Sequence, residues 1–230
     1  TMYWNEDTNE EAEYKVPEDI IDINFRIKCA QLKLDHVDAL SQAMCDKLPW
    51  LATDSGSGIF SIHGAESGNG WIRPQNPDDL IYPSRRTLFT LRISNQRLAT
   101  TEALQGDHIE VDGVTLEFGK SSIRPLSRLT TLFCRYVDLG PVEDEDAFLQ
   151  QALKELQLLG IRPKKMMCGR ITQLVLNGQL GVTRSLMVDG IDVAQSVLLQ
   201  QRGIGFGRLL GCGLFLPHKG IDAINEAQEK

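Results

Sequence analysis

The first half of the chain alternates between strand-like and helix-like spacing of its hydrophobic positions. Residues 20–32 (IIDINFRIKCAQL) place apolar side chains at nearly every second position, which is typical of a strand with one buried face. Residues 36–48 (HVDALSQAMCDKL) repeat apolar residues at helical spacing, and Asp35 is placed to cap that helix. Similar patterns predict strands at 58–62 and 85–93, a helix at 95–104, and a hairpin at 108–118 around Asp112-Gly113.

The second half repeats this order of elements. Its pattern predicts a strand at 123–138, a helix at 143–159, strands at 165–173 and 181–188, a helix at 192–201 and a strand at 213–216. Each half therefore follows the order βαββαβ, which is that of a ferredoxin-like domain with two helices on one face of a four-stranded sheet. We expect an α+β protein with tandem ferredoxin-like domains, whose RRM-like antiparallel sheets leave one face open for a ligand.

These patterns divide the chain into two domains and two tails. We expect an acidic flexible tail over 1–19, an N-terminal ferredoxin-like domain over 20–119, a C-terminal ferredoxin-like domain over 120–220 and a short tail over 221–230. A chain of 230 residues is long enough for two such domains, each of about 100 residues.

The distribution of charge matters more than its sum. The net charge of −7 argues by itself against a nucleic-acid partner. Seven acidic residues stand against one lysine within residues 1–19, however, so this tail carries −6 and the rest of the chain only −1. Residues 161–187 and 201–220 together contain eight Lys and Arg residues and no acidic residue. The charge pattern therefore leaves RNA binding open.

Composition also limits the compartment and the cofactors. No run of about 18 apolar residues occurs, and residues 1–19 contain no apolar signal-peptide segment, so we expect a cytoplasmic protein with no membrane partner. The five cysteines are widely spread and never form a CxxC pair, which argues against a disulfide framework and against a zinc site. We expect no metal and no cofactor.

Five glycines within eleven residues mark the segment 203–213 (GIGFGRLLGCG). Glycine lets backbone N–H groups approach a phosphate closely, so one interpretation is a loop that cradles phosphate or the RNA backbone. The alternative is a tight, packed connection between a helix and a strand. A dinucleotide-binding fingerprint is excluded, because Arg208 stands where its third glycine belongs and the loop leads from a helix into a strand.

The pattern Gly-hydrophobic-Gly, five residues, Gly-hydrophobic-Gly resembles the glycine-rich loop of the repeat-associated RNA-binding superfamily of CRISPR systems, which is built on ferredoxin-like domains. The strings GCGLFLPHKG (211–220), IHGAESGNGWIRP (62–74) and VTRSLMV (182–188) resemble the Myxococcus-type subtype of its repeat-processing endoribonucleases. The resemblance covers residues 20–220. It implies a metal-independent nuclease that cuts the repeat of precursor CRISPR RNA and leaves a 5′-hydroxyl and a 2′,3′-cyclic phosphate.

Such cleavage needs a base for the 2′-OH proton, and histidine suits that role. His36 is the first candidate, because it lies at the predicted start of the first helix and there resembles the catalytic histidine of several members of the family. His63 is the second, since it opens a long polar loop. Some relatives pair the histidine with a tyrosine and a lysine, but the first helix here has no tyrosine, and Tyr82 and Lys33 are the nearest substitutes.

Polar and basic side chains near these motifs are the candidate RNA contacts, since Lys and Arg neutralise phosphates and Arg also binds guanine edges. They are Ser67, Asn69, Arg73, Arg162, Lys164, Lys165, Arg170, Arg184, Arg202, Arg208 and Lys219, with the loop glycines Gly203, Gly205, Gly211 and Gly213. The alternative for the basic residues is a solvated charged surface.

Three functions remain open from the sequence. The first is an endoribonuclease acting on CRISPR repeat RNA, with His36 as general base and His63 sharing or replacing that role. The second is a non-catalytic RNA-binding subunit of a CRISPR effector complex, with other effector subunits as partners. The third is an unrelated ferredoxin-like duplicate that binds a small ligand. The sequence leaves open whether the protein is a monomer or a homodimer.

Overall fold

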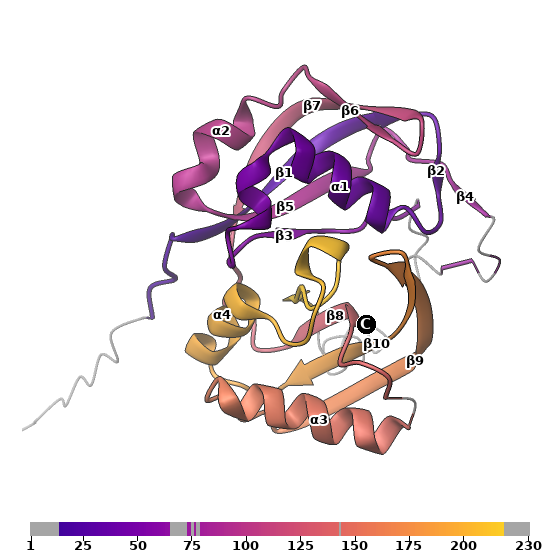
Figure 1. The fold of residues 1–230 in the computed structure, drawn as a ribbon. Coiled ribbons are helices and arrows are strands. Elements are labelled where there is room, and N and C mark those ends of the chain that lie inside the picture. Colours follow the sequence, from indigo (N-terminus) through magenta and orange to yellow (C-terminus); the bar gives the residue numbers. More distant parts are fainter. Residues whose placement is uncertain (1–13, 65–72, 75, 77–78, 143, 219–230) are drawn as a thin grey trace, which may run out of the picture.

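Each half of the chain forms one main antiparallel sheet with its own helices, and the two halves pack against each other (Figure 1). The computed structural model describes residues 14–64, 73–74, 76, 79–142 and 144–218. Most of the predicted N-terminal tail, the whole predicted C-terminal tail, and the candidate residues Ser67, Asn69 and Lys219 lie outside these ranges. Within the described part of the chain, no helix combines the length and the apolar character needed to cross a membrane.

The first sheet has the strand order β3-β5-β1-β7-β6. Its elements are β1 (Ile20–Cys29), α1 (Val37–Lys47), β3 (Gly58–Ile59), β5 (Leu88–Ser94), α2 (Leu98–Glu102), β6 (His108–Val111) and β7 (Val114–Pro125). Alternate side chains of β1, such as Ile21, Ile23 and Phe25, are buried in the core that the sheet shares with α1. A small second ladder pairs β2 (Leu32–Lys33) with β4 (Leu80–Ile81), and a 3₁₀ turn over Pro49–Ala52 follows α1.

The second sheet has the order β11-β8-β10-β9. Its elements are β8 (Leu132–Val137), α3 (Glu145–Leu158), β9 (Lys165–Leu176), β10 (Gln179–Asp189), α4 (Val193–Arg202) and β11 (Leu216–Pro217). Both helices of this domain are capped at their N-terminus by an aspartate. The carboxylate of Asp144 accepts the backbone N–H of Ala147, and that of Asp192 accepts the backbone N–H of Gln195, both at 2.8 Å. In the first sheet β1 lies between β5 and β7, and in the second sheet β8 lies between β10 and β11. In both cases the first strand of the βαββαβ unit lies between its third and its fourth, which is the ferredoxin-like order. The predicted α+β fold is therefore confirmed.

One strand predicted from the sequence is in fact two strands, which belong to different sheets. The sequence suggested a single strand over 123–138, but β7 continues to Pro125 and pairs with β1, with Ile123 opposite Ile23 and Pro125 opposite Ile21. The second sheet begins only at Leu132. The predicted domain boundary at residue 119 consequently falls within β7. Hydrophobic spacing is equally compatible with either sheet, so the pattern gave no sign of the break.

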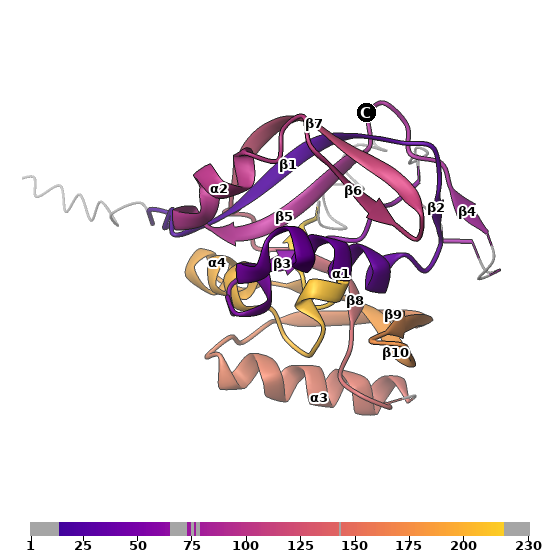
Figure 2. The ribbon, with the colours of Figure 1, turned by 45° about the horizontal axis from the view of Figure 1, so that its top comes forward.

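The two domains are joined by the buried guanidinium of Arg92. The guanidinium of Arg92 on β5 donates from Nε and Nη2 to the carboxylate of Asp22 on β1 at 2.7 and 3.0 Å. Its Nη1 donates across the boundary to the carbonyls of Gln200 and Phe215, at 2.7 and 3.0 Å. A small apolar cluster also spans the boundary and consists of Val37, Tyr136, Leu174, Leu176, Leu210 and Cys212. The domains thus form one packed unit (Figure 2).

Candidate active site

His36 is fixed where the chain turns from β2 into α1. It occupies the N-cap position of the helix and is 1% exposed. Its Nδ1 donates to the carbonyl of Lys33 at 2.9 Å, and its Nε2 accepts the backbone N–H of Ile62 at 3.0 Å, which defines the neutral tautomer. Burial lowers the pKa of His36 below its usual value. Both ring nitrogens are therefore committed to the backbone, and the first-choice base of the sequence analysis has no nitrogen facing a substrate.

His63 is positioned by the hydrogen bond between His36 and the backbone of Ile62, because it directly follows Ile62. Its imidazole is half-buried and lies beside the ring of Tyr136 on β8, with the ring centroids 6.5 Å apart. Burial, followed by the positive charge of Arg135 and the proximity of His36 and Arg73, lowers the pKa of His63 to about 3. His63 is thus neutral at physiological pH, the form that accepts a proton.

Arg73 links the two domains at this point. Its guanidinium forms an ion pair with Asp35 and donates to the carbonyl of Leu34 at 3.4 Å. It also forms a hydrogen bond with the side chain of Tyr136, whose hydroxyl has a pKa raised by burial. Asp35 was predicted to cap α1, but its carboxylate is engaged by Arg73 instead. His36 takes the cap position, and its side chain makes no capping bond to the N–H groups of the helix.

Tyr136 was missed in the sequence, where it reads as one more core position of a strand. The two substitutes suggested there do not join His63. Tyr82 follows β4 and is 64% exposed, and the ammonium of Lys33 pairs with Asp112 at 3.3 Å. The tyrosine beside the histidine comes from the other domain, so only the packing of the two sheets reveals it.

A cleft of about 400 Å³ opens beside Arg73. The first domain contributes one wall and β9 of the second domain contributes the other; the lining residues are Leu34, Asp35, Arg73, Pro74, Ile171, Thr172 and Gln173. In the described ranges, no group of three or more His, Cys, Asp or Glu side chains is arranged to hold a metal ion. A substrate in this cleft would lie next to Arg73, which lines the cleft and also contacts Tyr136.

Comparison with protein families decides which group of proteins this arrangement belongs to. The family model described as Cas6 Crispr matches residues 21–220, which is most of the chain. The chain belongs to the Cas6 family. A relative from Myxococcus xanthus (strain DK1622), named CRISPR-associated endonuclease Cas6, is 31% identical over 197 residues, which cover 86% of this chain and 81% of the relative.

Solved structures of Cas6 proteins share the fold. A structure described as CRISPR associated protein Cas6 matches with a TM-score of 0.58 and 12% identity, covering 87% of this chain and 100% of that chain. A Cas6-related protein from Pyrococcus furiosus matches with a TM-score of 0.52 and 10% identity, covering 86% and 98%. At such low identity these matches support the fold alone.

The glycine-rich loop of this Cas6 protein is a packed connection, the alternative left open by its sequence. A Cβ on Gly203 would lie 2.1 Å from the carbonyl oxygen of Gly213, and one on Gly205 would lie 2.2 Å from that of Asp138. All five glycines, including Gly207 and Gly211, have positive φ. These glycines are required because backbone segments cross here at close range, with no phosphate needed to explain them.

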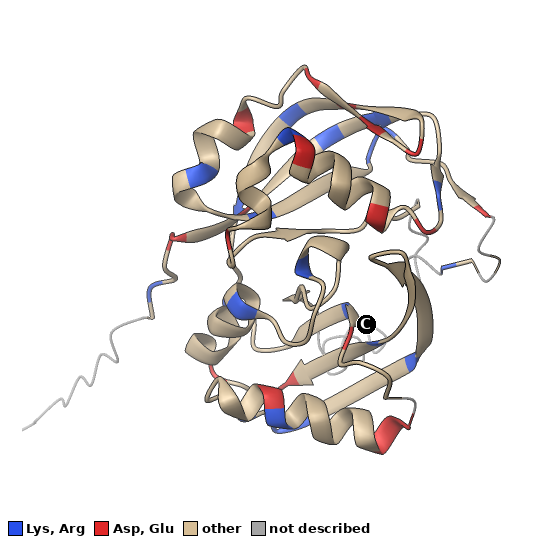
Figure 3. Cartoon of the chain, viewed as in Figure 1, with Lys and Arg blue, Asp and Glu red and all other residues tan. Residues whose placement is uncertain are grey.

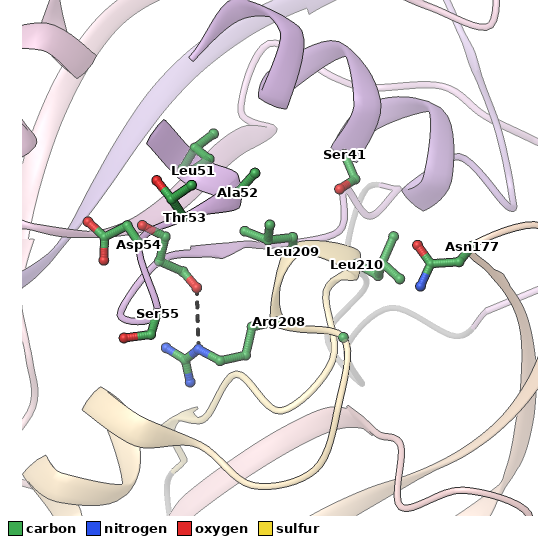
Figure 4. Close-up of a pocket in the computed structure, with 12 residues that line it drawn as sticks. Ser41, Leu51, Ala52, Thr53, Asp54, Ser55, Asn177, Arg208, Leu209 and Leu210 are labelled. Carbon is green, nitrogen blue, oxygen red and sulfur yellow. Dashed lines mark hydrogen bonds between the residues drawn. The ribbon is translucent and has the colours of Figure 1, made fainter. Parts of the chain in front are cut away.

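Arg208 in this loop is a clamp between the domains. Its guanidinium donates to the carbonyls of Ser57 and Gly56 at 3.3 Å and to that of Gln201 at 3.0 Å. It lines a groove of about 440 Å³ between the α1 region and the glycine-rich loop. The side chains around this groove are drawn in Figure 4. Because its Nε and Nη2 are engaged by three carbonyls and its Nη1 is buried, Arg208 is removed from the expected RNA contacts together with the loop glycines.

The remaining basic candidates divide by exposure. Arg184 is 5% exposed and donates from Nη1 to Glu145 at 3.2 Å and to the carbonyl of Gly169 at 2.9 Å, so it too is removed. Arg202, at the end of α4, is exposed. The other exposed candidates lie on or just before β9, among the blue segments of Figure 3, and are Arg162, Lys164, Lys165 and Arg170. They precede or lie on the strand that lines the cleft.

Proposed function

We propose that this protein is an endoribonuclease that cleaves precursor CRISPR RNA within its repeats, without a metal ion, to give mature guide RNA. The observation that supports this best is the neutral, half-buried His63, held beside Tyr136 and Arg73 at the domain boundary. Membership of the Cas6 family and the Myxococcus xanthus relative named as an endonuclease support the same reaction.

In the proposed reaction, His63 takes the proton of the 2′-OH next to the scissile phosphate. The 2′-oxygen forms a bond to phosphorus, the bond from phosphorus to the 5′-oxygen breaks, and that oxygen leaves with a proton from water. The products are a 2′,3′-cyclic phosphate and a 5′-hydroxyl. Arg73 stabilises the charge of the phosphorane, and Tyr136 holds Arg73 in place.

The low pKa of His63 is compatible with this role once RNA is bound. Positive Arg135 and Arg73 contribute to lowering that pKa in the free protein. A phosphate near both guanidinium groups supplies negative charge, which favours a protonated imidazole and raises the pKa of His63. The substrate itself thus makes the imidazole a stronger base.

Cleavage of labelled repeat RNA from the CRISPR array of the same genome tests the proposal. We expect full cleavage in excess EDTA, a product whose terminal phosphate resists phosphatase until acid opens the cycle, and no cleavage of RNA with a single 2′-deoxynucleotide at the cut. Dependence on added Mg²⁺ would contradict the metal-free mechanism. Tight binding with no cleavage would instead assign the protein to the non-catalytic subunits.

The exposed lysines that lead into β9 are expected to bind RNA phosphates. Replacing Lys164 and Lys165 together by alanine should weaken repeat RNA binding and reduce the slope of log K against log salt by about 2, because each phosphate contact contributes about one unit. The slope is measured by fluorescence anisotropy over a salt series. The control replaces Lys120 and Lys154, two exposed lysines elsewhere. An equal change in both double variants would place the RNA on another surface.

A further inference from the structure

The β9–β10 hairpin reaches across the domain boundary and meets the first turn of α1 (Figures 1 and 2). The carboxylate of Asp38 accepts the backbone N–H of Asn177 at 2.8 Å and that of Gly178 at 2.6 Å. Both residues form the two-residue turn of the hairpin and have positive φ, 53° and 73°. The strand ladder pairs Leu176 with Gln179, so these two amides lie outside it and are satisfied by Asp38.

Three consecutive residues at the start of α1 connect different parts of the site. His36 holds the backbone of Ile62 through its Nε2 atom, next to His63. Val37 belongs to the apolar cluster that includes Tyr136. Asp38 holds the turn of the hairpin. One helical turn therefore fixes the base, the tyrosine and the hairpin relative to one another.

The hairpin carries one wall of the cleft. Ile171, Thr172 and Gln173 of β9 line it opposite Arg73, and the exposed Lys165 and Arg170 lie on the same strand. The distance from an RNA held along β9 to His63 thus depends on where the hairpin is anchored. A charged carboxylate is a strong acceptor for such an anchor, and its place in the first turn of α1 suits the positive end of the helix.

We infer that Asp38 is a positioning residue for the RNA cleavage proposed above, on which this inference rests. Asp38 anchors the β9–β10 hairpin to α1, so that RNA bound along β9 presents its scissile phosphate to His63. The two hydrogen bonds that carry this role connect Asp38 to residues that lie 139 and 140 positions later in the sequence. Loss of the anchor should leave the phosphate-binding cations on β9 in place but let their distance from His63 vary.

The test compares Asp38→Asn and Asp38→Ala with Asp46→Asn, which removes the same charge from an exposed position of the same helix. Hydrogen exchange on the full chain without RNA reports the Asn177 and Gly178 amides. RNA affinity and the single-turnover cleavage rate are then measured at saturating protein. We expect faster exchange at both amides, a cleavage rate about 10- to 100-fold lower, and a Kd within about 3-fold of the wild type, because misplacement by about 1 Å is costly for the reaction. Asp46→Asn should behave as the wild type.

Different outcomes overturn different steps of this inference. Unchanged exchange at the turn in Asp38→Ala would show that Asp38 does not anchor the hairpin. Faster exchange with an unchanged cleavage rate would show that the anchor has no positioning role, as would a rate loss fully accounted for by the unfolded fraction in urea titrations. Absence of cleavage by the wild type would contradict the proposed function and the positioning role together, whereas the exchange measurement would still decide whether the anchor exists.

Discussion

Replacement of His63 by alanine is expected to lower the single-turnover rate of repeat RNA cleavage by at least about 100-fold, the usual contribution of a positioned general base. RNA affinity should change little, because the cations expected to hold the phosphates lie on and before β9. The measurement is single-turnover cleavage in EDTA at saturating protein, with the Kd determined on a non-cleavable 2′-deoxy substrate.

His36 supplies the decisive control for this experiment. His36→Ala leaves the Ile62 N–H and the Lys33 carbonyl without their imidazole partner, so it should destabilise the protein by about 2–4 kcal/mol and reduce cleavage through His63. His36→Gln, whose amide both donates and accepts, should recover much of the stability and of the rate. Normal cleavage by His63→Ala, together with a loss in both His36 variants without unfolding, would return the base role to His36.

Replacement of Arg92 by methionine is expected to lower the free energy of unfolding by about 3–5 kcal/mol. It removes the partner that bonds both oxygens of the buried Asp22 carboxylate and leaves Arg124 on one of them, and it takes the donor from two buried carbonyls. Arg92 is 0% exposed, and its guanidinium bonds both to Asp22 and to two carbonyls of the other domain. Burial alone would raise the pKa of Asp22, but the positive Arg92 and Arg124 lower it below its ordinary value. Urea unfolding at neutral pH measures the loss.

The matched control is Arg26→Met, since Arg26 is an exposed arginine of the neighbouring strand β1. This variant should change stability by less than about 0.5 kcal/mol. Adding Asp22→Asn to Arg92→Met should restore part of the stability, because the buried negative charge that Arg92 had balanced is then removed. If Arg92→Met and Arg26→Met unfold at the same urea concentration, the bonds of Arg92 do not hold the domains together.

Much of the fold follows from local patterns in the sequence. The alternation over 20–29 and the helical spacing over 145–158 report which positions face a core, and this was enough for the order of elements in both domains. Asp112-Gly113 was predicted as a hairpin turn, and both residues have the positive φ that this turn requires. The cap of α3 by Asp144 is a contact of the same local kind, because it spans only three residues, although it was not predicted.

The candidate site was only half visible in the sequence. His36, His63 and Arg73 stood out by residue type, but their geometry did not, because periodicity says that a side chain is buried without saying what covers it. The partner of His36 is 26 residues away, and Tyr136 comes from the other domain. Arg184 and Arg208 were predicted to contact RNA for the same reason, since a charge pattern does not reveal that an arginine side chain is folded inward onto backbone carbonyls.

The sequence by itself determined the order of elements in the two ferredoxin-like domains, the Asp112-Gly113 turn, and the residue types from which a site is built, because these depend on contacts within a few positions. Only the tertiary structure decided which histidine faces Tyr136, that the glycine-rich loop is a close backbone crossing, and that Asp38 meets the β9–β10 turn. The physical reason is that these features depend on how two sheets pack together, and the energies involved act between residues far apart along the chain.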